Sequence, residues 1–320
     1  MKNIICIGGA NIDRKLISSC TLQIGTSNPV SSYSVFGGVA RNVAENLGYW
    51  TKDISLQCLV GDDSPGRELL VHMQKMGINI DQCRILSNQK TPYYYAIHSQ
   101  NGELYLGLAD MAIYDHISES SFTESWKAWN ANTIVFIDTN LSPALIQKAI
   151  SHCLKCSAIL CIDPVSVVKS SRLPQSLEGV YLLKPNHDET RALTGLPLQT
   201  IADCLQAGRQ LIQRGVENVV ISLGRSGYVI VNSTFEEYVP AVQFSEVNDV
   251  CGAGDAFIAG VLFGLQQNAS LIEACELGAA AAAFTIQSHK TVVDDITAPQ
   301  LRAFVNNQKK LKEHPHAAHI

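Results

Sequence analysis

The chain has 320 residues, of which 46% are hydrophobic and 17% are charged, and its formal net charge is −5. These totals describe an ordinary globular protein, and the negative charge excludes a general attraction to nucleic acid or anionic membranes. The apolar run at 279–286 is too short to span a bilayer, and no secretory signal is visible. We therefore expect a cytoplasmic enzyme or binding protein that acts on a small, locally recognised ligand.

The first predicted elements place polar side chains just beyond a core strand. Residues 4–7 form an apolar, strand-like run, and Asn11 and Asp13 follow it. Ligands bind at the carboxyl ends of the strands in an open parallel sheet, so both side chains are candidates for substrate contacts. Residues 14–35 alternate only weakly, which predicts short strands that stand off the core.

A glycine pair, Gly37 and Gly38, opens the next predicted helix. Apolar residues recur behind it at helical spacing as far as Gly48, which is typical of a helix end. This pattern places Asn42 in about the first turn, on the ligand side. A surface amide without a ligand role is the alternative for Asn42.

A strand is predicted at 54–60, and a helix at 64–77. Ser64 is the expected N-cap of this helix, because Pro65 then takes the first helical position.

The dipeptide Asn101-Gly102 is the strongest short hairpin signal in the chain, and it joins strands predicted at 91–100 and 103–109. Alternation puts Tyr93 and Tyr95 on one face of the hairpin and Tyr94 on the other. We expect one face to close over a ligand and the other to meet a partner subunit, although core packing is the commoner role for a single tyrosine.

From residue 133 onward strands and helices alternate, which favours a parallel sheet covered on both faces. The predicted strands are 133–137, 158–162, 180–183, 219–223 and 228–231. One predicted helix is capped by Ser142, and the others are 188–193, 201–214, 256–267 and 270–287. No core pattern is visible beyond Asn306, and we expect residues 311–320 to form a flexible tail.

The stretch 248–257 organises the prediction of function. Gly252 and Gly254 permit a tight turn, and a helical pattern begins directly behind them. The first amide N–H groups of that helix and its positive dipole end suit an anion, above all phosphate. Asp255 would repel a resting phosphate, so it fits better as a general base that takes a proton from a hydroxyl. The alternative is an acid that merely complements the helix dipole.

Four ordered motifs, at 36–44, 184–189, 222–227 and 249–257, resemble those of the ribokinase-like (PfkB) carbohydrate kinases. A Walker A loop and a dinucleotide glycine motif are both absent from the sequence. The resemblance runs from Gly8 to about His289. It implies an α/β fold with three layers: a doubly wound, mostly parallel sheet between helices, with a small β lid. It also implies a single kinase domain at 1–310, with the lid formed by about 12–35 and 91–111.

The resemblance assigns roles residue by residue. Asp255 matches the catalytic base, and the amides of Gly252, Ala253 and Gly254 match the anion hole. The substrate contacts that it implies are Asn11, Asp13, Gly37, Gly38, Asn42 and Asn140, with Asn140 at a place where ribokinases often have a glutamate.

The phosphoryl donor implied by the resemblance is ATP. The nucleotide contacts are Asn186, Ser222, Gly224, Gly227 and Gly254, and Glu189 organises Mg²⁺ through water. Val250 and Cys251 replace the threonines usual before the glycines, which leaves a K⁺ site beside the loop as an open question.

Three shorter runs, 27–29, 110–113 and 163–169, resemble pseudouridine kinases more than ribokinase. They imply that the 5′-hydroxyl of pseudouridine is the phosphoryl acceptor, with the Tyr93–Tyr95 hairpin and the Asn28 region covering the uracil. Two alternatives stay open: a family kinase for another sugar or nucleoside, and a silent sugar- or nucleoside-binding regulator. Lids of this family often pair between subunits, so a homodimer is expected.

Overall fold

Eight strands form the central sheet in the computed structural model, which describes residues 2–116, 119–242, 244 and 247–313. They are β1 (Asn3–Ile7), β4 (Ile54–Gln57), β9 (Thr133–Asp138), β10 (Ile159–Asp163), β11 (Leu182–Leu183), β12 (Asn218–Ser222), β13 (Tyr228–Asn232) and β14 (Glu236–Val239). Their order is β14-β13-β12-β11-β10-β9-β1-β4. The strands from β4 to β12 pair in parallel, and β13 and β14 add an antiparallel edge.

The apolar strand residues serve two cores, because successive side chains point to opposite faces of a sheet. In β9, Ile134 and Phe136 lie in one buried cluster, whereas Val135 and Ile137 lie in the other. A parallel sheet covered on both faces therefore reads as a continuous apolar run, as the sequence shows at 133–137.

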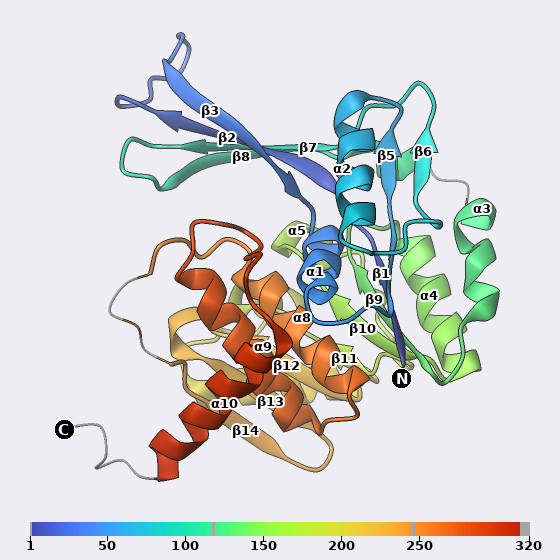
Figure 1. Cartoon of the computed structure of the whole chain (residues 1–320). Coiled ribbons are helices and arrows are strands. Elements are labelled where there is room, and N and C mark those ends of the chain that lie inside the picture. The colour runs from blue at the N-terminus through green and yellow to red at the C-terminus, as the bar shows by residue number, and fades with distance from the viewer. Residues whose placement is uncertain (1, 117–118, 243, 245–246, 314–320) are drawn as a thin grey trace.

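Helices cover each face of the sheet (Figure 1). One layer contains α1 (Val39–Gly48), α2 (Ser64–Lys75), α8 (Ala253–Gln266), α9 (Leu271–Ile286) and α10 (Ala298–Glu313). The other contains α3 (Glu119–Thr123), α4 (Pro143–Cys156), α6 (His187–Thr194) and α7 (Ile201–Gln213), with the short α5 (Val167–Ser170) beside α6. Short 3₁₀ helices in the described part of the chain are η1 (Ala112–His116), η2 (Glu124–Ala128) and η3 (Gly224–Ser226). The predicted three-layer α/β architecture is confirmed.

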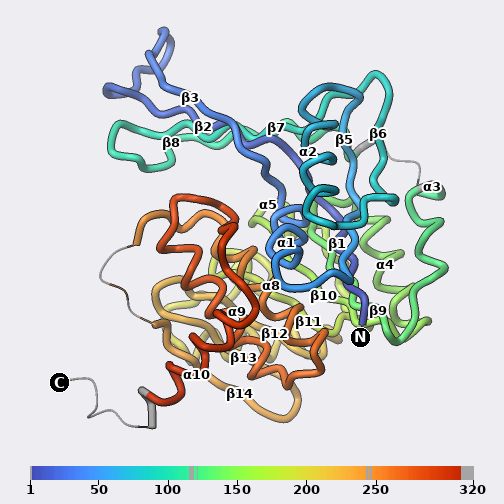
Figure 2. Tube along the Cα trace, viewed as in Figure 1, coloured from blue at the N-terminus to red at the C-terminus, as the bar shows by residue number. Residues whose placement is uncertain are grey.

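A second sheet stands away from this body, as the tube in Figure 2 shows. It has the order β3-β2-β7-β8 and is made of β2 (Asn11–Ser18), β3 (Val30–Gly37), β7 (Tyr93–His98) and β8 (Leu104–Asp110). Its strands occupy the two segments expected to form a lid, and β7 and β8 form the predicted antiparallel hairpin. Closure of this lid sheet over a ligand stays a prediction.

The structure corrects the strand predicted at 54–60. It is divided at Cys58, because β5 (Leu59–Gly61) leaves the central sheet and pairs with β6 (Arg84–Leu86).

The N-cap predicted for the following helix was also wrong. Asp63 caps α2 by accepting a hydrogen bond from the Gly66 amide at 3.0 Å, since an ionised carboxylate is the stronger acceptor, and Ser64 instead donates to Glu68.

The C-terminal region is more ordered than the sequence pattern predicted. Helix α10 continues to Glu313, whereas the rest of the tail predicted at 311–320 lies outside the described residues. Among the described residues, no helix is long and apolar enough to cross a membrane.

Candidate active site

The loop at 249–254 forms the N-terminus of α8 as predicted. Gly252 is the N-cap with φ 80°, and a Cβ there would lie 2.0 Å from the Thr291 carbonyl oxygen, so glycine is required. The Ala253 amide donates to Val250 at 3.3 Å, while the amides of Gly254 and Asp255 make no hydrogen bond to a described residue. Free amides at a helix N-terminus suit a phosphate group.

The Asp255 carboxylate lies in the first turn of α8 and accepts a hydrogen bond of 2.6 Å from the side-chain amide of Asn42. Burial raises the pKa of Asp255 to about 7, with Asp163 adding to the rise and Asn42 and Lys184 opposing it. A carboxylate that gains a proton near neutral pH is suited to general-base catalysis.

The predicted substrate residues meet at the base of the lid sheet. Asn11 donates to Asp13 at 2.6 Å, and a Cβ on Gly37 would lie 2.2 Å from the Asp13 carboxylate. Gly38 has φ 96°, and a Cβ there would lie 2.4 Å from the Gly9 carbonyl oxygen. Burial raises the pKa of Asp13, and the Asn11 hydrogen bond partly offsets this rise. The two glycines thus let β3 and α1 approach Asp13 closely.

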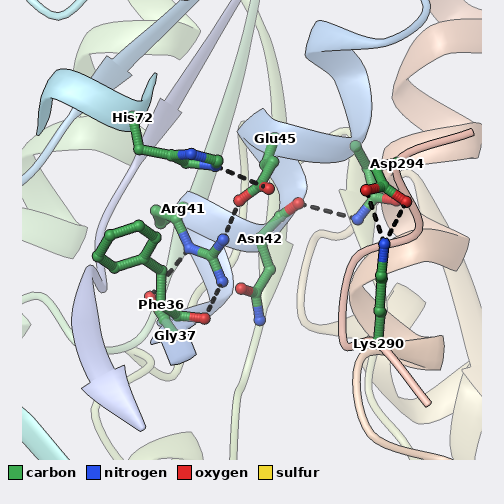
Figure 3. Close-up of polar contacts among 9 residues, drawn as sticks. Phe36, Gly37, Arg41, Asn42, Glu45, His72, Lys290 and Asp294 are labelled. Atoms are coloured by element: carbon green, nitrogen blue, oxygen red, sulfur yellow. Dashed lines mark hydrogen bonds and ion pairs between the residues drawn. The ribbon is translucent and has the colours of Figure 1, made fainter. Parts of the chain in front are cut away.

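Arg41, which the sequence analysis left without a role, braces this glycine pair (Figure 3). Its guanidinium is buried and donates to the carbonyls of Phe36 and Gly37 at 2.6 and 3.1 Å, and it pairs with Glu45. Glu45 in turn contacts His72 of α2 at 3.0 Å. The sequence signal that could have identified Arg41 was a charged residue within the glycine motif at 36–44.

Asp138, at the end of β9, is a second residue that the sequence analysis missed. It accepts hydrogen bonds from the amides of Gly9 and Ala40 at 2.8 and 2.9 Å, and from the Asn140 amide at 2.9 Å. It therefore connects the loop after β1, the first turn of α1 and the loop after β9 at the carboxyl edge of the sheet. A carboxylate directly after an apolar strand was the signal that could have identified it.

The predicted nucleotide residues also lie together. Asn186 and Glu189 form a capping box at the start of α6, and both carboxylate oxygens of Glu189 accept hydrogen bonds from Asn186 at 2.9 Å. Ser222 forms a parallel bridge with Asn186, and it is followed by Gly224 and Gly227, with φ values of 57° and 97°. The capping box explains both residues structurally, while each Glu189 oxygen retains a lone pair for water.

Lys184 is a third missed residue, although it belongs to the 184–189 motif. The residue is 3% exposed, and its ammonium pairs with Asp163 at 2.9 Å and lies 3.7 Å from a Cβ built on Gly254. Burial alone would lower its pKa, but the neighbouring carboxylates of Asp163, Glu189 and Asp255 raise it. Burial and Asp163 also raise the pKa of Glu189 to about 7.

The charges of this cluster fit a bound cation. Three carboxylates share one ammonium, an excess of negative charge that a divalent ion would neutralise. Among the described residues, no group of three or more His, Cys, Asp or Glu side chains could hold a metal ion directly.

The hairpin residues divide between the two faces of the lid sheet as the alternation predicted. Tyr93 and Tyr95 stack at 5.6 Å on one face, whereas Tyr94 pairs with Asp13 in register and shares its face. Asn28 exchanges hydrogen bonds with the backbone of Gln23 and lies in the connection between β2 and β3. Of these residues, Tyr94 lies on the face that Asp13 occupies.

An ion pair that was not predicted links the lid sheet to the α8 loop. Lys15 of β2 contacts Asp249 at 3.3 Å, and Asp249 accepts the Cys251 amide at 2.9 Å. The glycine loop and the lid sheet are therefore connected directly.

The fold is ribokinase-like, as its solved neighbours show, and the family match makes the protein an ATP-dependent phosphotransferase. The chain belongs to the pfkB family of carbohydrate kinases, whose model matches residues 1–298. Membership implies ATP as the donor, Mg²⁺ in general, and small sugars or nucleosides as acceptors.

The chain is similar to individual kinases of this family that act on different acceptors. It is 28% identical to pseudouridine kinase from Escherichia coli K12 over 258 residues, which is 81% of this chain and 82% of the relative. It is 26% identical to guanosine-inosine kinase from Exiguobacterium acetylicum, over 90% of this chain and 95% of that protein. Arabidopsis thaliana ribokinase complexed with ribose and ATP shares the fold, with a TM-score of 0.80, 18% identity, and coverage of 95% of this chain and 98% of that one.

Proposed function

We propose that the protein transfers the γ-phosphoryl group of ATP to the 5′-hydroxyl of pseudouridine, giving pseudouridine 5′-phosphate and ADP. The similarity to pseudouridine kinase over most of both chains supports this substrate. The runs at 27–29, 110–113 and 163–169 support it as well.

The chemistry rests on one observation, the Asp255 carboxylate held by Asn42 at the N-terminus of α8. Asp255 takes the proton of the primary hydroxyl as its oxygen bonds to the γ-phosphorus, and the bond to the ADP oxygen breaks. The amides of Gly252, Ala253 and Gly254 are the proposed donors that stabilise charge on the transferring group. Ala253 is the weakest of them in this arrangement, since its amide also reaches Val250.

Asp13 and Asn42 are the proposed anchors of the ribose hydroxyls. The Asn42 side-chain oxygen is buried and has no hydrogen-bond partner among the described residues. A buried acceptor without a partner is costly, and a substrate hydroxyl would satisfy it. Asn11 orients Asp13, and the Arg41 brace holds the glycine turn beside it.

The nucleotide is proposed to lie along Asn186, Ser222, Gly224 and Gly227. Glu189 would hold Mg²⁺ through water, and the bound ion would neutralise phosphate charge. Whether a K⁺ ion binds beside Val250 and Cys251 is tested by replacing K⁺ with Na⁺ in the activity assay.

We further propose a homodimer joined through the lid sheets. The edge strand β8 exposes Leu104, Leu106 and Leu108, each between 46% and 56% accessible, and an unpaired apolar edge favours a partner strand or sheet. Light scattering of the wild type and of Leu106→Lys tests this: a dimer that becomes a monomer is expected. A cytoplasmic location is proposed because ATP is the donor and all ten cysteines are free thiols.

The deciding experiment measures ADP formation with Mg²⁺ against pseudouridine, uridine, ribose, fructose, adenosine and guanosine. The proposal predicts a clear preference for pseudouridine that Asp255→Asn abolishes, while ATP binding is retained. Preference for another acceptor would overturn the substrate and keep Asp255 as the base. Normal turnover by Asp255→Asn would overturn the catalytic role.

A further inference from the structure

A polar cavity of about 300 Å³ lies between the lid sheet and the body of the protein. It is lined by residues 109–112 at the end of β8, by Asn140 after β9, and by Lys169 and Arg172 at α5. The cavity lies near the proposed substrate residues, because the Asn140 side-chain nitrogen in its lining is 2.4 Å from a Cβ built on Gly9, and Gly9 contacts Gly38. Its volume is at the lower limit of ligand pockets, which suits part of a small molecule.

Hydrogen-bond donors in this wall are not used by the protein. Lys169 makes one hydrogen bond among the described residues, to the Asn140 side-chain oxygen at 2.5 Å, although an ammonium has three donors. The Asn140 side-chain nitrogen, Nδ2, donates to no described residue. By contrast, one guanidinium nitrogen of Arg172 donates to the backbone carbonyls of residues 139, 140 and 141, at 2.8 to 3.3 Å, and so stabilises the loop after β9.

A strained turn holds Lys169 in place. Val165 has φ 64°, which is rare for a β-branched residue, and Ser166 donates across it to Pro164 at 2.7 Å in a tight γ-turn. Asp163 fixes this turn by accepting the Val165 amide at 2.8 Å. Strain of this kind persists where the surrounding structure enforces it, and it clusters at functional sites.

We propose that this cavity binds the heterocyclic base of a nucleoside substrate, and that Lys169 is a specificity-determining residue that selects bases carrying carbonyl oxygens. This inference rests on the proposed kinase function. Uracil presents two carbonyl oxygens to donors such as Lys169 and Asn140, and N–H groups to an acceptor such as Asp110. Ribose alone lacks these carbonyl and N–H groups, so the cavity would add affinity for the nucleoside over the sugar.

A phosphate group on a sugar substrate is the competing occupant, because Lys169 and Arg172 are cationic. The Asp110 carboxylate in the same lining disfavours a phosphate dianion, and Arg172 is already engaged by backbone carbonyls. The Lys169 ammonium and the Asp110 carboxylate balance each other in charge, so the lining suits a neutral ligand with both hydrogen-bond donors and acceptors.

Calorimetric binding without ATP tests the inference independently of turnover, with pseudouridine, ribose and fructose 1-phosphate as ligands. Lys169→Met should weaken pseudouridine binding by about tenfold or more, as expected for loss of a charged hydrogen bond, and change ribose binding less than about threefold. Lys155→Met, on the exposed last turn of α4, is the matched control and should change neither. Asp110→Ala, an exposed position, provides a second variant with the same expected selectivity.

Equal losses for ribose and pseudouridine would overturn the base-binding role, and so would a selective loss of fructose 1-phosphate binding. Should turnover assays select another nucleoside over pseudouridine, the proposed function fails while the same comparison, made with that nucleoside and ribose, still decides the role of Lys169.

Discussion

Replacement of Asn42 by leucine removes the hydrogen bond to Asp255 on which the proposed chemistry depends, together with the proposed contact to a ribose hydroxyl. Asn42 is buried, so leucine fills its volume without exposing polar atoms, but it donates no hydrogen bond to Asp255. Loss of this hydrogen bond destabilises the ionised form of Asp255 much more than the protonated form. The pKa of Asp255 must therefore rise in the variant.

The size of this rise follows from the contact. A hydrogen bond to a charged group contributes about 1.5–3 kcal/mol, and one pKa unit corresponds to about 1.4 kcal/mol. Loss of the Asn42 bond should thus raise the pKa of Asp255 by about one to two units above its present value of about 7. The base then ionises only in alkaline solution.

The assay is kcat/KM for the preferred acceptor across about pH 5.5 to 9.5, for the wild type and Asn42→Leu side by side. The acid limb should move to higher pH by the amount of the pKa rise, whatever the fall in the plateau, because the limb reports the base in the free enzyme. Ionisation of the nucleotide is common to both enzymes and cancels in the comparison. An unmoved acid limb in an active, folded Asn42→Leu variant would refute the role of this contact.

Three further outcomes are expected. Burial raises the pKa of Asp255 from 3.8 to about 7, so the free energy of unfolding of the wild type falls as pH rises through that window. At pH 8, the free energy of unfolding of Asp255→Asn, measured with urea, should exceed that of the wild type by up to about 4 kcal/mol. At pH 4 the two values should be equal. Glu189→Gln should raise the Mg²⁺ concentration for half-maximal rate by about tenfold, and superimposable Mg²⁺ titrations would contradict its role. Gly38→Ala should lower the free energy of unfolding by about 1–3 kcal/mol more than Gly25→Ala, because both have positive φ but a Cβ clashes at Gly38 alone; equal losses in urea unfolding would remove that explanation.

Local patterns in the sequence were sufficient for most of the fold. Apolar runs at 133–137 and 219–223 predicted buried parallel strands, and glycine turns predicted the starts of α1 and α8, because these features depend on neighbours within a few residues. The strand at 54–60 was predicted as one element, since no local signal shows that Leu59–Gly61 pairs with a segment at 84–86.

The sequence by itself was sufficient for the glycine loop, for the family and for the proposal of Asp255 as the base, because Asp255, Gly252 and Gly254 are adjacent along the chain. Only the tertiary structure decided which distant residues contact one another in the site. Asn42 contacts Asp255 across 213 positions of the chain, and Lys169 contacts Asn140 across 29. Contacts of this range depend on how the sheet brings its loops to one edge, and no spacing in the sequence encodes them. The pKa of Asp255 likewise depends on burial by elements remote in the chain, so its value near neutrality is a property of the fold.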